Sequence, residues 1–155
     1  MPENTVINNI RADIIAISGR AFYDCENLVG ITIPAGVTSI GIHTFAYCHS
    51  LTAITIPAGV TSIGGSAFTF CYSLTEITIP AGVTSIGSGV FSDCWSLTEI
   101  TIPAGVTSVG DSAFLFWTPS QTINIEGHAS QASADAAWGS GWRYECLATI
   151  NYLGN

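Results

Sequence analysis

The sequence predicts a solenoid, in which successive coils of chain stack into a column. The segment from Leu51 to Gly64 recurs almost letter for letter at every 23rd position, with copies that begin at Leu28, Leu74 and Leu97. Apolar side chains alternate over the first part of each copy and then recur at every third position. One copy cannot fold alone, because ordering its residues costs about 1.5 kcal/mol each and burying a large apolar side chain returns only roughly 1.5–3 kcal/mol. Stacked copies cover one another's apolar faces.

Each coil is expected to open with a strand and to continue through tighter turns. Ile54 and Ile56 are separated by Thr55, which is the alternation of a half-buried strand. Pro57 ends this strand because it has no N–H to donate, and glycines allow the corners that follow. Stacked coils are then expected to pair these strands in a parallel ladder with a spacing of about 4.8 Å.

The repeat decays at both ends of the chain. A partial copy precedes the regular ones, with apolar residues one full period before those of the next coil: Ile14, Ile17, Phe22 and Cys25. A further copy follows, in which Ile123 continues the column of Ile100. We therefore divide the chain into an N-terminal segment that forms a weak cap (residues 1–13), a repeat array (14–117), and a decayed repeat with a C-terminal cap (118–155).

Composition and charge exclude several classes of protein. The chain has 155 residues, of which 48% are hydrophobic and only 9% are charged, so it can fill a core and is not disordered. Three arginines and no lysine face eleven acidic residues, which gives a net charge of −8 and no positive patch for nucleic acid or anionic lipid. No apolar run approaches the roughly 20 residues of a transmembrane helix, and the charges near the start of the chain predict no export signal.

The cysteines are predicted to be buried thiols rather than ligands or nucleophiles. Four of the five share the period of the repeat and so form one column of the solenoid: Cys25, Cys48, Cys71 and Cys94. Trp117 stands where the next cysteine of the column would fall. Metal motifs bring their ligands close together in sequence, as in Cys-x-x-Cys, and the chain has no such spacing. We therefore expect neither a metal nor a cofactor.

Catalytic chemistry has two weak candidates. Glu76 and Glu99 occupy the same column, which brings their carboxylates to about 5 Å, the separation found in retaining glycosidases. Cys146 and His128 are the residue types of a nucleophile and its base, but nothing in the sequence orients the histidine. We expect solvated surface at the glutamates and no enzyme, with a hydrolase as the minor alternative.

The repeat Leu-x-x-Ile-x-Ile-Pro-x-x-Val-x-x-Ile-Gly-x-x-x-Phe-x-x-Cys-x-x-Leu resembles the BspA-type (treponeme-type) leucine-rich repeats of bacterial and some protozoan surface proteins. The resemblance covers about residues 14–126, and the tail, with Trp138, Trp142 and then Cys146 to Tyr152, looks like the segment that closes such arrays. It implies a leucine-rich-repeat solenoid with a curved parallel sheet on one face and short strands or 3₁₀ turns on the other. It also implies a binding or adhesive role outside the cell. Reduced thiols, in contrast, are typical of proteins in the cytoplasm.

Variation among the copies is concentrated around the phenylalanine and the cysteine, where aromatic residues dominate. Side chains between and just after these inward residues are expected to point outward and to stack in two columns. The first column is predicted to hold Tyr23, Tyr47, Phe70, Asp93 and Phe116, and the second to hold Glu26, His49, Tyr72, Trp95 and Thr118.

Eight of these residues form what we call the aromatic stripe: Tyr23, Tyr47, His49, Phe70, Tyr72, Asp93, Trp95 and Phe116. We predict that the aromatic stripe is a binding surface, because exposed rings on a rigid support offer a large contact area at low entropic cost. The equally weighted alternative is that the rings only fill gaps between turns.

The outward face of the strands, which we call the strand face, is the second candidate surface. Thr32, Thr55, Thr78 and Thr101 form a ladder of hydroxyl groups there, and Asn124 continues it. Such a regular array suits a periodic ligand such as a glycan chain. Its uniformity favours the alternative, a ladder that serves only β-propensity and solubility.

These features predict a non-catalytic module that recognises a protein or a glycan through a rigid repeat surface. The main alternative is a self-assembling structural or adhesive protein that forms a homo-oligomer. A thin N-terminal cap leaves a strand edge open near residues 14–17, and open edges invite pairing with another chain.

Overall fold

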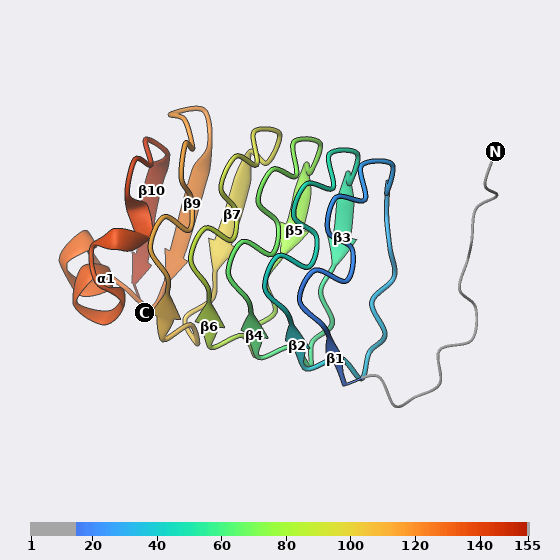
Figure 1. Cartoon of the computed structure of the whole chain (residues 1–155). Helices are drawn as coiled ribbons and strands as arrows, with labels where there is room; N and C mark the ends of the chain where they lie inside the picture. The colour runs from blue at the N-terminus through green and yellow to red at the C-terminus, as the bar shows by residue number, and fades with distance from the viewer. Residues whose placement is uncertain (1–14, 155) are drawn as a thin grey trace.

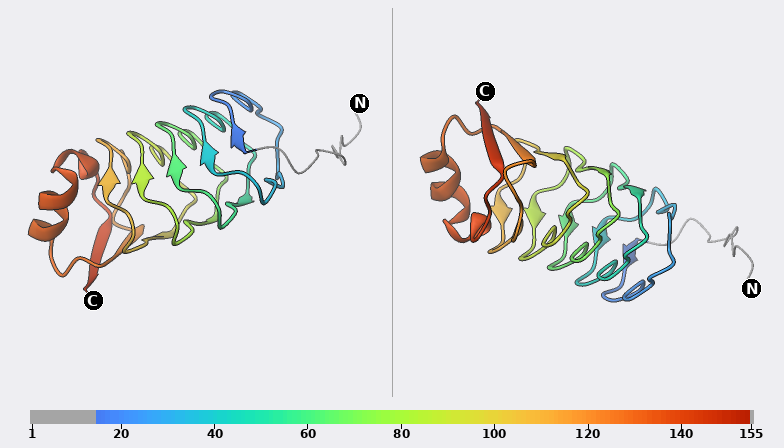
Figure 2. Two further views of the ribbon diagram at one scale, coloured as in Figure 1. Left: turned by 90° about the horizontal axis from the view of Figure 1, so that it is seen from below. Right: turned by 90° about the horizontal axis from the view of Figure 1, so that it is seen from above.

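In the computed structural model, which describes residues 15–154, the chain winds into coils that stack side by side in one column (Figure 1). The coils run from the N-terminal end towards α1 (Gln131–Trp138), which lies at the other end of the column. Figure 2 shows the column from below and from above, with rows of strands along its length. The solenoid predicted from the period of the sequence is confirmed, since strands pair in parallel with the same offset.

One side of the column carries a five-stranded parallel sheet of very short strands. Its members are β1 (Ala16–Ile17), β2 (Ser39–Ile40), β4 (Ser62–Ile63), β6 (Ser85–Ile86) and β8 (Ser108–Val109). Each residue pairs with the one at the same place in the next coil, as Ile40 does with Ile63. The expectation for this side was either short strands or 3₁₀ turns, and short strands form.

The strand face carries the longer strands. They are β3 (Ala53–Thr55), β5 (Glu76–Thr78), β7 (Glu99–Ile102), β9 (Thr122–Glu126) and β10 (Thr149–Gly154). Their pairings are parallel, and a single bridge joins Thr32 to Thr55 ahead of them. Ile100 pairs with Ile123, so the decayed copy continues the array as predicted.

The ladder of the strand face is interrupted between β5 and β7, although the repeat predicts continuous pairing. The Thr75 amide donates to the Thr52 carbonyl at 2.9 Å, yet within the described chain the corresponding bond from Thr98 to Thr75 does not form. The register places Glu76 and Glu99 side by side at this step, and like charges on neighbouring strands disfavour pairing. The expectation of one continuous ladder is therefore wrong at this step.

A run of consecutive turns follows each short strand and leads back towards the strand face. In this run the backbone is left-handed at two positions per coil, as at Ser66 (φ 54°) and Phe70 (φ 59°). Its amides donate forward to the next coil, as from Phe68 to Val90 at 3.0 Å. Amides near the strands donate backward instead, as from Thr75 to the previous coil. The coils are thus hydrogen-bonded along the turns as well as along the sheets.

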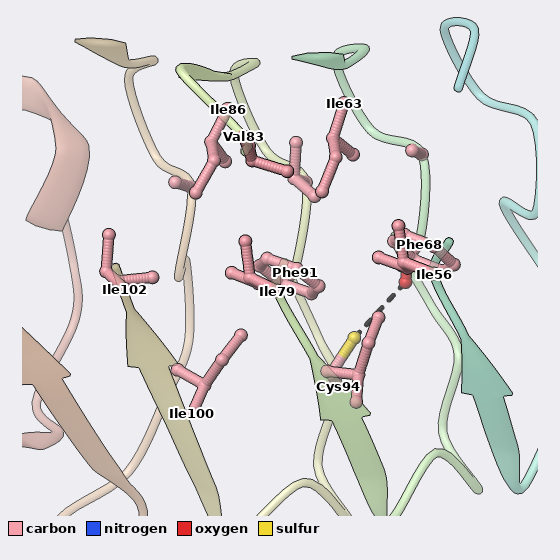
Figure 3. Close-up of a cluster of buried hydrophobic side chains, with 14 of the residues drawn as sticks. Ile56, Ile63, Phe68, Ile79, Val83, Ile86, Phe91, Cys94, Ile100 and Ile102 are labelled. Atoms are coloured by element: carbon pink, nitrogen blue, oxygen red, sulfur yellow. Dashed lines mark hydrogen bonds between the residues drawn. The ribbon is translucent and has the colours of Figure 1, made fainter. Parts of the chain in front are cut away.

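The core lies inside the coils and consists of side chains stacked in columns (Figure 3). Phe45, Phe68 and Phe91 are fully buried, and their nearly parallel rings have centroids 5.4 and 5.8 Å apart. Each buried thiol donates to a phenylalanine carbonyl of the preceding coil, as Cys94 does to Phe68 at 3.2 Å (Figure 3). Trp117 ends the cysteine column as predicted, because its indole Nε1 donates to the Phe91 carbonyl at 2.8 Å in place of a thiol.

Close stacking depends on a column of glycines at the ends of the short strands: Gly41, Gly64, Gly87 and Gly110. A Cβ atom on Gly87 would lie 2.4 Å from the amide nitrogen of Gly65 in the preceding coil. No side chain fits at such a distance from backbone, so glycine at this column sets how closely the coils approach one another.

The C-terminal end is covered by α1 and by the 3₁₀ helix η1 (Gly141–Arg143). Trp142 is fully buried and packs edge-on against Phe114 and Trp138, with centroids 6.2 and 5.6 Å away. Asp135 holds this region together, because it accepts from the Trp142 indole at 3.0 Å and from Arg143 at 2.9 Å. In the described part of the chain no helix is long and apolar enough to cross a membrane.

The division into three segments stays a prediction. The segment assigned to residues 1–13 lies outside the described residues, and the boundary at residue 117 falls inside a continuous column of coils.

Candidate binding surface

The second predicted column of the aromatic stripe forms a stack of rings. His49 and Tyr72 have ring centroids 4.8 Å apart, and Tyr72 and Trp95 have centroids 4.6 Å apart. The planes are close to parallel, with angles of 13° and 28°. Trp95 ends the stack and is 59% exposed, since the column continues with Thr118, which has no ring.

The first column has a looser ring contact, in which the planes of Tyr47 and Phe70 are tilted by 36°. Tyr47 and Phe70 have ring centroids 4.7 Å apart. The residue one full period before Tyr47 is Asp24, and its φ of 61° matches the 64° of Tyr47. The prediction that Tyr23 occupies this column is therefore wrong for the backbone. The Tyr23 ring nevertheless packs edge-on against Tyr47 at 5.4 Å, so it stays part of the surface.

Asp93 is in its predicted column but does not point freely into solvent. Backbone hydrogen bonds between coils place it between Phe70 and Phe116. The Phe70 amide donates to the Ser92 carbonyl, and the Asp93 amide donates to the Leu115 carbonyl. Only 6% of the residue is exposed, and its Oδ2 accepts from the Ser92 hydroxyl at 2.8 Å. The expectation of an outward Asp93 is therefore wrong, because the residue is buried and its carboxylate bonds to the neighbouring Ser92.

Exposure is graded along the aromatic stripe. Trp95, Phe116 and Tyr23 are 59, 50 and 41% exposed. The four remaining aromatic members are half-buried because neighbouring rings cover their faces: Tyr47, His49, Phe70 and Tyr72. Desolvation, with a smaller contribution from the charge of Asp93, raises the pKa of Tyr72, so its phenol is a neutral donor. The rings therefore pack between coils and also present their edges to solvent.

The strand face presents the hydroxyl ladder as predicted, with Thr32, Thr55, Thr78 and Thr101 all exposed. The ladder continues through Asn124 to Asn151, whose Nδ2 donates to the Asn124 Oδ1 at 2.9 Å. Asn124 in turn donates to Glu99. Sequence reasoning missed Asn151 because its offset from Asn124 departs from the regular period of the repeat.

Two hollows of the surface lie on the strand face. A groove of about 620 Å³ follows the interruption between β5 and β7, and its lining includes Thr78, Thr101, Glu76, Glu99 and Glu126. A smaller one of about 430 Å³ lies between Thr32 and Thr55. Shape alone favours the strand face for a small ligand, whereas exposed rings favour the aromatic stripe for a macromolecule.

The side chains considered for catalysis or metal binding are spread over separate places. Glu99 is engaged by Asn124, and His128 packs against the Trp138 ring at 4.8 Å. Burial raises the pKa of Cys48 to about 11 and that of Cys94 to about 12, and it also raises the pKa of Cys146. A raised thiol pKa keeps the sulfur protonated and a poor nucleophile. Within residues 15–154 no group of three or more metal-ligating side chains is placed to hold an ion.

Comparison with known proteins agrees with this architecture. The family model described as BspA type leucine rich repeat region matches residues 9–140 in six copies. A leucine rich repeat protein of T. pallidum superposes with a TM-score of 0.70 at 28% identity, over 91% of this chain and 64% of that chain. One from Bacteroides ovatus gives 0.68 at 27% identity, over 90% of this chain and 41% of that one.

A leucine rich cell surface protein of Faecalibacterium prausnitzii gives a TM-score of 0.63 at 32% identity, over 83% of this chain and 33% of that chain. This chain therefore spans less than two thirds of the length of each of these three structures. None of the curated proteins matches it.

Proposed function

Because this chain belongs to the BspA-type leucine rich repeat family, we propose that it is a non-catalytic interaction module that recognises a protein or a glycan through the aromatic stripe. Repeat proteins of this kind are typically interaction modules, and their fold is generally non-enzymatic. The observation that carries the proposal is the stack of His49, Tyr72 and Trp95, which ends in the exposed Trp95 indole. Tryptophan and tyrosine are the side chains that most often dominate binding energy at interfaces.

Rigidity supports the proposal. The rings of Tyr47, His49 and Tyr72 each pack on a ring of the next coil, and the backbone around them is hydrogen-bonded to neighbouring coils. Little conformational entropy then remains to be lost when a partner binds, so contact area converts more fully into affinity. The hydroxyl groups of the strand face are equally regular but offer neither a large apolar area nor a distinctive pattern.

Replacing Trp95 with alanine is expected to weaken binding by about 10-fold or more, as for an interface hot spot, and Tyr72→Ala is expected to act in the same direction. The partner is first captured from extracts or on a glycan array, and the affinity of each variant is then measured by surface plasmon resonance. Thermal unfolding should change little for Trp95→Ala, because that side chain is 59% exposed.

Thr55→Ala and Thr78→Ala are the matched controls on the strand face. If they abolish binding while Trp95→Ala does not, the strand face is the site and the proposal is wrong. If Trp95→Ala unfolds the protein, the stripe is core and not a surface.

Self-assembly is the second candidate function, and the first described coil favours it. Ile15 and Val29 are 68 and 61% exposed there. The Phe22 ring stacks on Phe45 at 5.2 Å, and within residues 15–154 no ring covers its other face. Among the described strands β1 pairs only with β2, and a strand edge that no neighbouring strand covers can pair with another chain.

Light scattering is expected to show a molecular mass that rises with protein concentration if this second function holds. Ile15→Glu together with Val29→Glu should restore a monomer, because burying two charges in an apolar interface is costly. Leu147→Glu, at the far end of the column and 70% exposed, is the control and should leave assembly unchanged. A wild-type protein that stays monomeric at all concentrations contradicts assembly.

A further inference from the structure

The strand β10 ends the row of longer strands, and within residues 15–154 no strand pairs with its outer edge (Figure 1). On the inner edge, the Thr149 amide donates to the Gln121 carbonyl at 2.9 Å. In a parallel ladder alternate residues bond to the same neighbouring strand, so Thr149 and Asn151 bond towards β9. The amides and carbonyls of Ile150 and Tyr152 therefore face the outer edge.

The side chains of these two residues are incompletely covered. Ile150 and Tyr152 pack against the core, yet both are only half-buried. Their partners on β9, Ile123 and Ile125, lie between two strands and are fully buried. One more strand beside β10 would give Ile150 and Tyr152 the same cover.

The sequence of β10 does little to protect this edge from pairing. Exposed edges are normally blunted by short length, charged side chains, proline or a bulge. β10 has six residues, more than any other described strand, and it contains neither a charged residue nor a proline. Its one irregularity of pairing falls after Tyr152, at the end of the strand. The edge is therefore suited to receive another strand.

A chain of side-chain amides indicates which residue fits beside Asn151. The Asn151 Nδ2 donates to the Asn124 Oδ1 at 2.9 Å, and Asn124 donates in turn to Glu99. Each asparagine thus donates towards the preceding strand. No hydrogen bond from the described part of the chain reaches the Asn151 Oδ1, so this acceptor can receive a donor from a following strand. An asparagine on that strand would extend the chain of amides by one member.

We infer that the outer edge of β10 binds an extended, uncharged segment of a partner protein, which adds a parallel strand to the sheet. An asparagine of the segment lies beside Asn151, and apolar residues on either side of it cover Ile150 and Tyr152. The segment is uncharged because β10 has no charge to pair with one. It is parallel because all pairings in this row are parallel.

The direction also separates a partner segment from a symmetric pair of copies. A twofold axis that pairs β10 with β10 makes the two strands antiparallel. The site is separate from the aromatic stripe and does not rest on the proposed function.

The test uses the acetylated and amidated peptide Gly-Thr-Ile-Asn-Ile-Thr-Gly, whose central residues copy residues 122–125. Binding to the whole protein is followed by NMR of the backbone amides. The amides of Ile150 and Tyr152 are expected to shift and to gain protection from hydrogen exchange. Those of Thr149 and Asn151 should change little, because they are already on the β9 side. A peptide that leaves Ile150 and Tyr152 unaffected overturns the inference.

Two methylated peptides test the direction of the added strand. In a parallel strand in register, the amide of the peptide asparagine faces β10 and the amide of the next isoleucine faces away. N-methylation of the asparagine is expected to weaken binding about 10-fold or more, and N-methylation of that isoleucine less than about 2-fold. Equal losses, or a larger loss for the isoleucine, contradict a parallel strand.

Asn151→Ala tests the pairing of side-chain amides, together with a peptide that has alanine in place of asparagine. Each change alone is expected to lower affinity about 5-fold, and the two together hardly more than either one. Asn27→Ala is the matched control, because it makes the same change at an exposed position of the first described coil and should leave affinity unchanged. Losses that multiply in the double variant contradict the asparagine pairing.

The outcome is independent of the aromatic stripe. Trp95→Ala should leave the affinity for the peptide unchanged, so peptide binding and the proposed function can fail separately. Light scattering tests the identity of the occupant. If the protein alone forms a dimer that the peptide dissociates, the edge belongs to a second copy and the partner segment is wrong.

Discussion

Replacing Phe68 with alanine is expected to lower the free energy of unfolding by about 3–5 kcal/mol, as is typical for a buried phenylalanine. Phe68 is fully buried, and its ring stacks on Phe45 on one side and on Phe91 on the other. Removing it leaves a cavity that is shared by two interfaces between coils. Because a domain is stable by only about 5–15 kcal/mol, such a loss brings the array close to unfolding. Urea denaturation followed by circular dichroism measures it.

Phe116→Ala is the control for this substitution. It removes the same kind of side chain two coils further along, from a residue that is 50% exposed. The expected loss is below about 1 kcal/mol, since little area leaves a buried environment. Equal losses at Phe68 and Phe116 would contradict the assignment of the phenylalanine column to the core.

Replacing Trp142 with alanine is expected to have an effect of similar size, about 3–5 kcal/mol, but concentrated at the C-terminal end. Trp142 joins the last coil to α1 through its contacts with Phe114 and Trp138. Residues next to it also close the backbone of that coil, because the carbonyl of Gly141 accepts from Ser112 at 2.8 Å. Hydrogen exchange should therefore accelerate first at the amides of the last coil and least in the coils before it.

Tyr144→Ala, two positions further on, is the control for the C-terminal end. Tyr144 is 60% exposed, so its removal should change stability by no more than about 0.5 kcal/mol. If Trp142→Ala instead accelerates exchange uniformly along the chain, the coils unfold as one unit and the C-terminal region has no separate role.

The regular part of the fold follows from the sequence because one physical rule repeats. A constant period brings identical side chains into contact. The spacing of the repeat therefore predicts the columns of Phe68 and Ile100, and it also predicts that Trp117 replaces a cysteine. The helix α1 does not follow from it. Its segment, Gln131–Trp138, occurs once, and it is fixed by the Ser130 cap and by contacts of Trp138 that no repeat reveals.

The candidate surface follows less completely, for reasons that differ between residues. The ring contacts at Tyr72 depend only on spacing, so sequence predicts them. The burial of Asp93 depends on how neighbouring side chains cover it, and a rule of inward and outward positions does not contain that information. The interruption beside Glu76 is similar, because identical columns elsewhere pair normally and only the charges differ.

The interruption between β5 and β7 gives the molecule unequal bending stiffness. Across this step the described strands of the strand face share no ladder bonds, whereas β6 remains paired with both β4 and β8 on the other side. A bend that moves β5 and β7 apart breaks no ladder hydrogen bond between them. A bend in the opposite sense pushes the carboxylates of Glu76 and Glu99 towards each other. The column is therefore most compliant at this one joint, and a ligand wedged into it would alter the curvature of the whole array.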